Sequence, residues 1–142
     1  MFSKILVALD GSEISLRAFE YALSFAKNEG SELHAIYVIE SGHSAPGPMD
    51  NNREIISQRF ESEGRELLDK ITAKANETGV KLNATLERGH AGDVIVKYAE
   101  KLSCDLIIIG SLGKTKLDRL ILGSVSSYVV KSAKTNILII RN

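Results

Sequence analysis

Cysteine is nearly absent from this 142-residue chain, which holds a single one. That residue, Cys104, excludes an internal disulfide and a zinc site built from several cysteines. Free cysteine is usually packed inside a protein, and Cys104 adjoins an apolar run at 105–109, so we expect a buried structural thiol. The histidines, His34, His43 and His90, lie far apart and show no metal-ligand spacing.

A surplus of charge is also missing, because 18 lysines and arginines balance 18 aspartates and glutamates. No overall field therefore attracts nucleic acid or an anionic membrane. No apolar run approaches the roughly 20 residues of a membrane-spanning helix, and the start of the chain shows no signal-peptide pattern. We expect a cytoplasmic protein that binds neither nucleic acid nor membrane, with residues 1–142 forming a single domain.

Apolar runs that suit strands alternate with amphipathic stretches that suit helices. Strands are expected at 4–9, 33–39, 80–87, 105–109 and 136–141. A helix should start at an N-cap Ser12 and stop at Gly30, a long one should cover 52–78, and two more should follow Gly92 and Gly123. The alternation of apolar and polar residues at 80–87 is typical of an edge strand. This order predicts an α/β fold with three layers, in which helices cover both faces of a five-stranded parallel sheet.

The stretch 110–126 carries most of the functional information. It follows the buried strand at 105–109, and Gly123-Ser124 stands where the next helix should begin, with Ser124 as the expected N-cap. Glycines stand at 110, 113 and 123. Glycine lets a ligand approach the backbone, and a helix start offers free amides and the positive end of the helix dipole. The stretch therefore predicts a site for phosphate or another anion.

Two other interpretations of this stretch are open. Gly113-Lys114-Thr115 looks like the end of a P-loop, but that motif needs a glycine five residues before Gly113, where the chain has Ile108. The glycines could instead form an ordinary surface loop, which their position between a buried strand and a helix start disfavours.

The spacing Gly-x2-Gly-x9-Gly-Ser over 110–124 resembles the nucleotide-binding signature of the universal stress protein family, in its ATP-binding branch. Residues 4–12 resemble the opening strand and acidic turn of that family, and 120–126 resemble its closing segment. The resemblance covers essentially the whole chain. It departs before the last strand, where many members have Cys-Pro and this chain has Thr135-Asn136.

The resemblance implies a doubly wound sheet with the strand order 3-2-1-4-5. Strands 1 and 4 are then neighbours, and the crevice at their carboxyl ends is the topological switch point where such sheets bind ligands. Asp10 and Gly110 directly follow these two strands, so segments a hundred residues apart should meet there.

The resemblance also implies ATP as the ligand, with or without Mg²⁺ or Mn²⁺. The residues expected to bind it are Leu9, Asp10, Val38, Gly110, Ser111, Gly113, Lys114, Gly123, Ser124, Val125 and Ser126. Phosphates would repel a carboxylate, so Asp10 should face the ribose or the adenine amino group; the alternative is an Asx-turn or helix cap. Val38 should contact adenine through its backbone, which is compatible with a plain core role.

Cationic and imidazole side chains near the predicted site have two interpretations each. Lys114, Lys116 and Arg119 could neutralise phosphates or could form a solvated basic loop. His43, in the Pro- and Gly-rich segment 40–50, could close over the ligand or could be an ordinary loop residue.

Catalysis is less well supported than binding. Phosphoryl transfer needs metal ligands and a group that orients the nucleophile, and Asp118, the only acid in the predicted phosphate loop, has no base to pair with. We expect no catalytic residue and at most slow ATP hydrolysis. The favoured function is an ATP-binding regulatory or sensing module of the stress response with an unknown protein partner. The alternatives are a slow ATPase or phosphotransferase and a nucleotide-free dimeric interaction scaffold.

The final strand predicts self-association. Residues 137–140 are four consecutive large apolar residues at an expected sheet edge, and only Arg141 adds charge. A two-fold axis would pair this edge with its own copy, and relatives that resemble this chain pair in this way. We expect a homodimer through residues 136–141, with the nucleotide clefts outside the interface.

Overall fold

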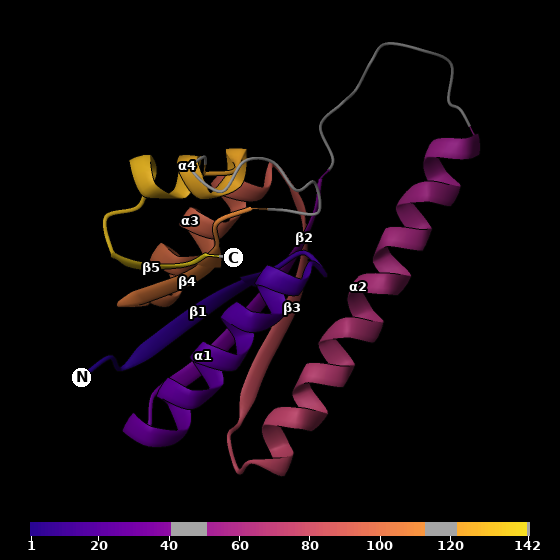
Figure 1. Ribbon diagram of the computed structural model, residues 1–142. Helices are drawn as coiled ribbons and strands as arrows, with labels where there is room; N and C mark the ends of the chain where they lie inside the picture. Colours follow the sequence, from indigo (N-terminus) through magenta and orange to yellow (C-terminus); the bar gives the residue numbers. More distant parts are fainter. Residues whose placement is uncertain (41–50, 113–121, 142) are drawn as a thin grey trace.

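The computed structural model describes residues 1–40, 51–112 and 122–141, with the backbone alone at 51–53. Strands and helices alternate along the chain (Figure 1). They are β1 (Lys4–Leu9), α1 (Glu13–Glu29), β2 (Glu32–Glu40), α2 (Asn51–Glu77), β3 (Leu82–Gly89), α3 (Ala91–Leu102), β4 (Leu106–Gly110), α4 (Ser124–Ser132) and β5 (Asn136–Ile140). The strands form one sheet in the order β3-β2-β1-β4-β5, and all neighbours are parallel. The predicted α/β class and strand order are therefore confirmed.

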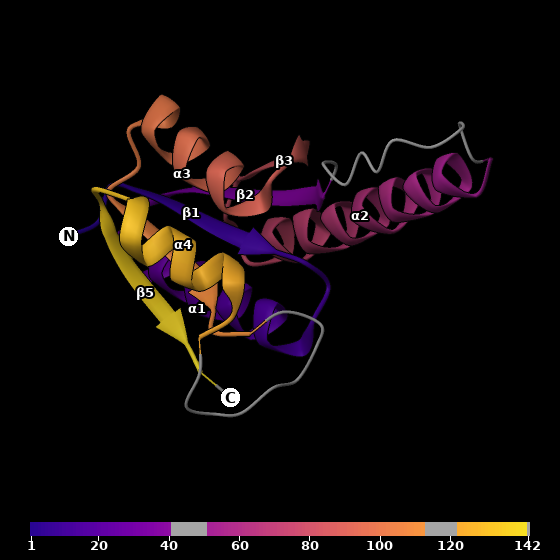
Figure 2. The same ribbon diagram turned by 90° about the horizontal axis from the view of Figure 1, so that it is seen from above.

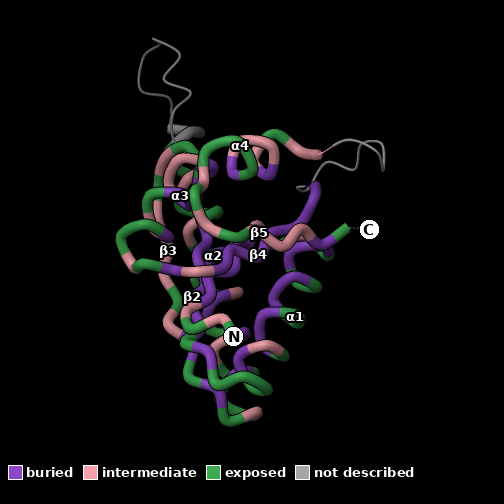
Figure 3. The backbone as a smooth tube through the Cα atoms, turned by 90° about the vertical axis from the view of Figure 1, so that its left-hand side faces the viewer, coloured by how far each residue is buried: buried purple, intermediate pink, exposed green. Residues whose placement is uncertain are grey.

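Helices cover both faces of the sheet (Figure 2). Successive side chains of a strand point to opposite faces, so Ile5 and Val7 of β1 pack in the cluster with α1 and α2, whereas Leu6 and Ala8 pack in the cluster with α3 and α4. Buried residues line the sheet and the helix sides that face it (Figure 3). None of the described helices is both long and apolar enough to cross a membrane.

The ends of α1 follow the predicted signals. The Ser12 hydroxyl accepts a hydrogen bond from the Ser15 amide at 3.2 Å, as an N-cap does. Gly30 adopts the left-handed conformation, with φ of 74°, and its N–H donates to the Ala26 carbonyl. These two caps fix where α1 starts and where the chain turns into β2.

The edge strand β3 differs in detail from its prediction. It covers Leu82–Gly89, and Ala84, which the alternation would place inside, is exposed. Ala84 lies beside a groove between β3 and α2, which Arg65 and Thr72 of α2 also line. The short alanine side chain leaves that groove open, so the alternation along an edge strand does not fix burial there.

Cys104 is buried, as expected, with 7% of its surface exposed. Burial raises the pKa of its thiol to about 11. The thiol therefore stays protonated near neutral pH, which suits a structural role.

Candidate functional site

A cavity of about 280 Å³ lies at the carboxyl ends of the central strands β1 and β4. Eight of the predicted ligand-binding residues line it: Leu9, Asp10, Val38, Gly110, Gly123, Ser124, Val125 and Ser126. They come from three strand ends and from the first turn of α4. Segments that are about a hundred residues apart in the sequence therefore meet at one site, as the strand order requires.

The sequence interpretation missed the contribution of α3. Ala91 and Ile95, one turn apart on α3, also line the cavity, as does Ser15 of α1. Together with Val38 of β2, the α3 residues make one side of the cavity apolar. The sequence did predict a helix after β3. Because helices that follow parallel strands begin at the same sheet edge, that helix start indicated that α3 would lie near the site.

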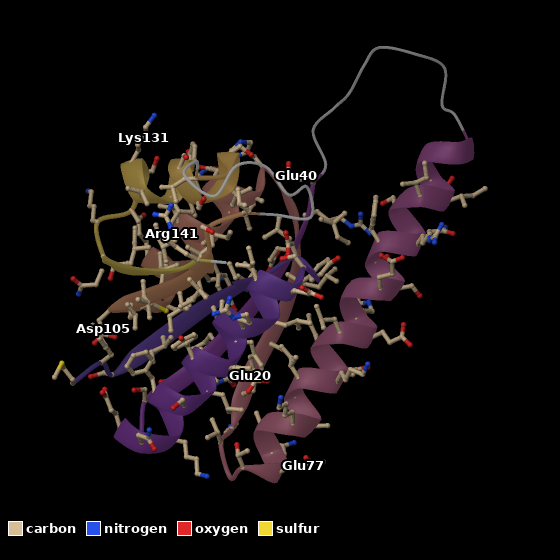
Figure 4. The ribbon with its side chains drawn as sticks, viewed as in Figure 1. Glu20, Glu40, Glu77, Asp105, Lys131 and Arg141 are labelled. Atoms are coloured by element: carbon tan, nitrogen blue, oxygen red, sulfur yellow. The ribbon has the colours of Figure 1, made fainter. Side chains whose placement is uncertain are left out.

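Glu40, at the end of β2 (Figure 4), holds the start of α3 in place. One carboxylate oxygen of Glu40 accepts a hydrogen bond from the Ala91 amide at 3.1 Å. His90 is the N-cap of α3, and its Nδ1 accepts a hydrogen bond from the Asp93 amide at 3.3 Å. Side chains therefore accept hydrogen bonds from two of the first-turn amides of α3, as Ser12 does from one amide of α1.

The start of α4 is different, and here the prediction of Ser124 as the N-cap is wrong. Gly123 is the N-cap, with an extended backbone, and Ser124 is the first helical residue. Gly123 has no side chain to cap the helix, and no side chain of the described residues does so instead. The amides of the first turn of α4 are thus left for another acceptor at the cavity.

Asp10 forms the Asx-turn that was one of its two interpretations, and it also lies at the cavity. One carboxylate oxygen accepts a hydrogen bond from the Ser12 amide at 2.9 Å, which closes an Asx-turn before α1. Asp10 is only partly buried and also lines the cavity. The turn fixes the side chain, and the second oxygen has no hydrogen-bond partner within the described part of the chain.

Ser111 is not among the residues that line the cavity. It is buried, and its amide donates a hydrogen bond to the Ile140 carbonyl at 2.8 Å. Its carbonyl accepts hydrogen bonds from the Gly123 amide at 2.6 Å and from the Ser126 hydroxyl at 2.9 Å. Ser111 therefore joins β4 to β5 and to the start of α4.

Gly110 lines the cavity, but packing also requires it to be a glycine. A Cβ at this position would clash with Cγ2 of Ile14 on α1. The missing side chain thus lets α1 lie close to the end of β4, in addition to keeping the backbone open to the cavity.

Gly113 and Lys114 lie outside the described residues, as do Lys116, Asp118, Arg119 and His43. Within the described ranges, no group of three metal-ligating side chains occurs. The described part of the site therefore consists of strand ends, an apolar wall and an uncapped helix start.

The strand order defines a doubly wound α/β protein, with a cavity at the switch point where such sheets bind ligands. The family model of the universal stress protein family matches residues 1–141. This chain belongs to that family.

Similar proteins of known sequence or structure agree with this family assignment. Universal stress protein MJ0531 of Methanocaldococcus jannaschii is 38% identical over 141 residues, which cover 99% of this chain and 83% of the relative. The solved structure of UspA from Lactobacillus plantarum is 26% identical and has a TM-score of 0.88, over 98% of this chain and 97% of that one. A universal stress protein of Arabidopsis thaliana, solved with AMP bound, is 25% identical with a TM-score of 0.72, over 99% of this chain and 92% of that one.

Proposed function

We propose that this chain binds ATP in the cavity at the ends of β1 and β4. The main observation behind the proposal is the start of α4. Its first turn lines the cavity, and no side chain in the described part of the chain caps the helix there. Phosphate oxygens would accept hydrogen bonds from the free amides of Ser124 and Val125 and would gain from the helix dipole. The proposal includes Gly113 and Lys114, which follow β4 in the sequence, as further phosphate contacts.

The opposite part of the cavity suits a nucleoside. Val38, Ala91 and Ile95 offer an apolar surface for a flat base, and the backbone of Val38 can pair with its edge. Asp10 would accept a hydrogen bond from a ribose hydroxyl or the adenine amino group through the oxygen that is not used in the turn. The AMP bound to the Arabidopsis relative supports an adenine nucleotide as the ligand.

The bound nucleotide would serve regulation in the stress response more than turnover. We expect at most slow hydrolysis of ATP, bound alone or with Mg²⁺ or Mn²⁺, which its phosphate oxygens coordinate. The nucleotide state would then govern contacts with a protein partner in the cytoplasm. The slow ATPase and the nucleotide-free scaffold remain the competing functions.

We also propose a homodimer through β5. Ile137, Leu138 and Ile139 are only partly buried, and β5 is an edge of the sheet. Antiparallel pairing of 136–141 with a second copy would add main-chain hydrogen bonds along this edge and cover these side chains. Light scattering of the purified protein tests this: a dimer is expected at micromolar concentration, and a monomer would contradict it.

The ligand can be identified directly. The protein is purified without added nucleotide and denatured, and the supernatant is analysed by chromatography and mass spectrometry. We expect ATP or its hydrolysis products in the supernatant. If the supernatant is empty, the stripped protein is titrated with ATP, and absence of binding in that titration as well would overturn the proposal and favour the scaffold.

A further inference from the structure

The two sides of the cavity come from different helices that must keep a fixed separation. Ala91 and Ile95 of α3 line the proposed base side, and Ser124 and Val125 of α4 line the proposed phosphate side. A nucleotide would bridge them, so its affinity depends on the spacing of the first turns of α3 and α4. Tyr128, one turn after Ser124 on α4, lies between these helices.

The ring of Tyr128 packs directly on α3. A Cβ added at Gly92 would lie 2.6 Å from Cδ1 of Tyr128, closer than side chains tolerate. The ring also meets the His90 imidazole edge-on, with centroids 5.1 Å apart and planes at 63°. Tyr128 therefore occupies the space that Gly92 leaves and sets how closely the helices approach.

The hydroxyl of Tyr128 makes a second contact with the same turn of α3. It donates a hydrogen bond to Oδ1 of Asp93 at 3.2 Å. Lys97 pairs with the other oxygen of Asp93 at 2.9 Å, and chiefly this contact lowers the pKa of the Asp93 carboxyl, which therefore stays an acceptor. Tyr128 therefore contacts His90, Gly92 and Asp93, which lie on either side of the cavity residue Ala91 in the sequence.

We propose that Tyr128 is a positioning residue for the nucleotide: it does not line the cavity but fixes the spacing of the α3 and α4 walls through Gly92, His90 and Asp93. The proposal rests on the proposed function, because the affinity it explains is that for ATP. Ring packing sets the spacing, and the hydroxyl contact adds to it.

The test compares ATP affinities by calorimetry in nucleotide-stripped protein, with unfolding temperatures measured beside them. Tyr128→Ala removes the ring that sets the spacing of the two helices, and we expect ATP to bind at least about 10-fold more weakly. Tyr128→Phe keeps the ring, whose packing sets the spacing, and should retain an affinity within about threefold of wild type.

Tyr98→Ala is the matched control. Tyr98 lies on α3 and packs against the same core cluster as Tyr128, but its hydroxyl faces Thr85 of β3 instead of the turn of α3 that Tyr128 contacts. This variant should lose thermal stability as Tyr128→Ala does, while its ATP affinity stays near the wild-type value. Equal losses of affinity in both variants would reduce Tyr128 to a structural residue and overturn the proposal.

Gly92→Ala tests the same contact in a chain that keeps Tyr128. The added Cβ should push α4 away and weaken ATP binding, and the same change in a Tyr128→Ala background should have little further effect. Additive losses in this cycle would contradict the proposal. A wild type that binds ATP beside a Tyr128→Ala variant of unchanged affinity would overturn the positioning role alone, whereas a wild type that binds no ATP would overturn both proposals.

Discussion

The Ser126 hydroxyl donates a hydrogen bond to the Ser111 carbonyl at 2.9 Å and ties the first turn of α4 to the end of β4. Ser126 is buried, with 2% of its surface exposed, and its hydroxyl also lies 3.1 Å from the Gly123 carbonyl. Because the Ser111 carbonyl still accepts from the Gly123 amide, removing the hydroxyl leaves no orphaned acceptor there. We predict that Ser126→Ala lowers the free energy of unfolding by about 1 kcal/mol.

Denaturant unfolding of Ser126→Ala and Ser127→Ala measures this contribution. Ser127 is the control, because it is the next residue of α4 and its hydroxyl makes only a 3.5 Å contact with the Leu122 carbonyl. Ser127→Ala should change stability much less than Ser126→Ala. Equal stability of the two variants would show that the Ser126 contact contributes nothing.

The close packing of Gly110 against Ile14 predicts that the destabilising effects of substitutions at the two positions are coupled. Gly110→Ala would force a Cβ into Cγ2 of Ile14, and such overpacking typically costs about 1–3 kcal/mol. Ile14→Ala removes that methyl group, so the second change should cost less in the Gly110→Ala background than in wild type. Thermal unfolding of the two single variants and the double variant measures the coupling, and strictly additive losses would contradict it.

Asp105, directly before β4 (Figure 4), predicts a dependence of stability on pH. Its two oxygens accept hydrogen bonds from the Ser3 and Lys4 amides at 2.8 and 2.9 Å. The Ser3 amide is the main cause that lowers the pKa of the Asp105 carboxyl in the folded protein. A lowered folded pKa means that the stabilisation is complete above about pH 4 and is lost as the pH falls through the folded pKa.

Asp105→Asn, which keeps the shape and one acceptor oxygen, should therefore be less stable than wild type at pH 7. The difference should shrink progressively as the pH is lowered below about 4. Urea unfolding of both proteins over this range checks the prediction. A difference that is constant with pH would show that the charge of Asp105 does not stabilise the N-terminal segment.

Much of the fold could be predicted from the sequence, because buried strands and capped helices leave local patterns. The apolar strands β1 and β4, the Ser12 cap and the Gly30 stop follow directly from such patterns. The strand order did not follow from them; it came from the family resemblance. Register and neighbour choice depend on contacts between distant residues, which periodicity does not encode.

The site was predicted less completely, for identifiable reasons. A serine beside a helix start can cap the helix or be its first residue, and spacing alone led to the wrong choice at Ser124. Ser111 was predicted at the ligand but is held inside by backbone hydrogen bonds. Ala91 and Ile95 carry no chemical signature, because an apolar cavity wall resembles any other core face.

Gly123 connects the structure most directly to the central claim of ATP binding. Its φ of −64° and ψ of 165° suit a branched side chain, so Gly123→Val should fold normally. The added side chain would occupy the cavity beside the free amides of α4 and should weaken ATP binding by more than about tenfold, or 1.4 kcal/mol. Calorimetric titration of ATP into stripped wild type and Gly123→Val is the decisive measurement. We predict saturable binding of one nucleotide per chain to wild type and binding at least about tenfold weaker to the folded variant; a wild type without binding, or a folded variant with wild-type affinity, would contradict the account.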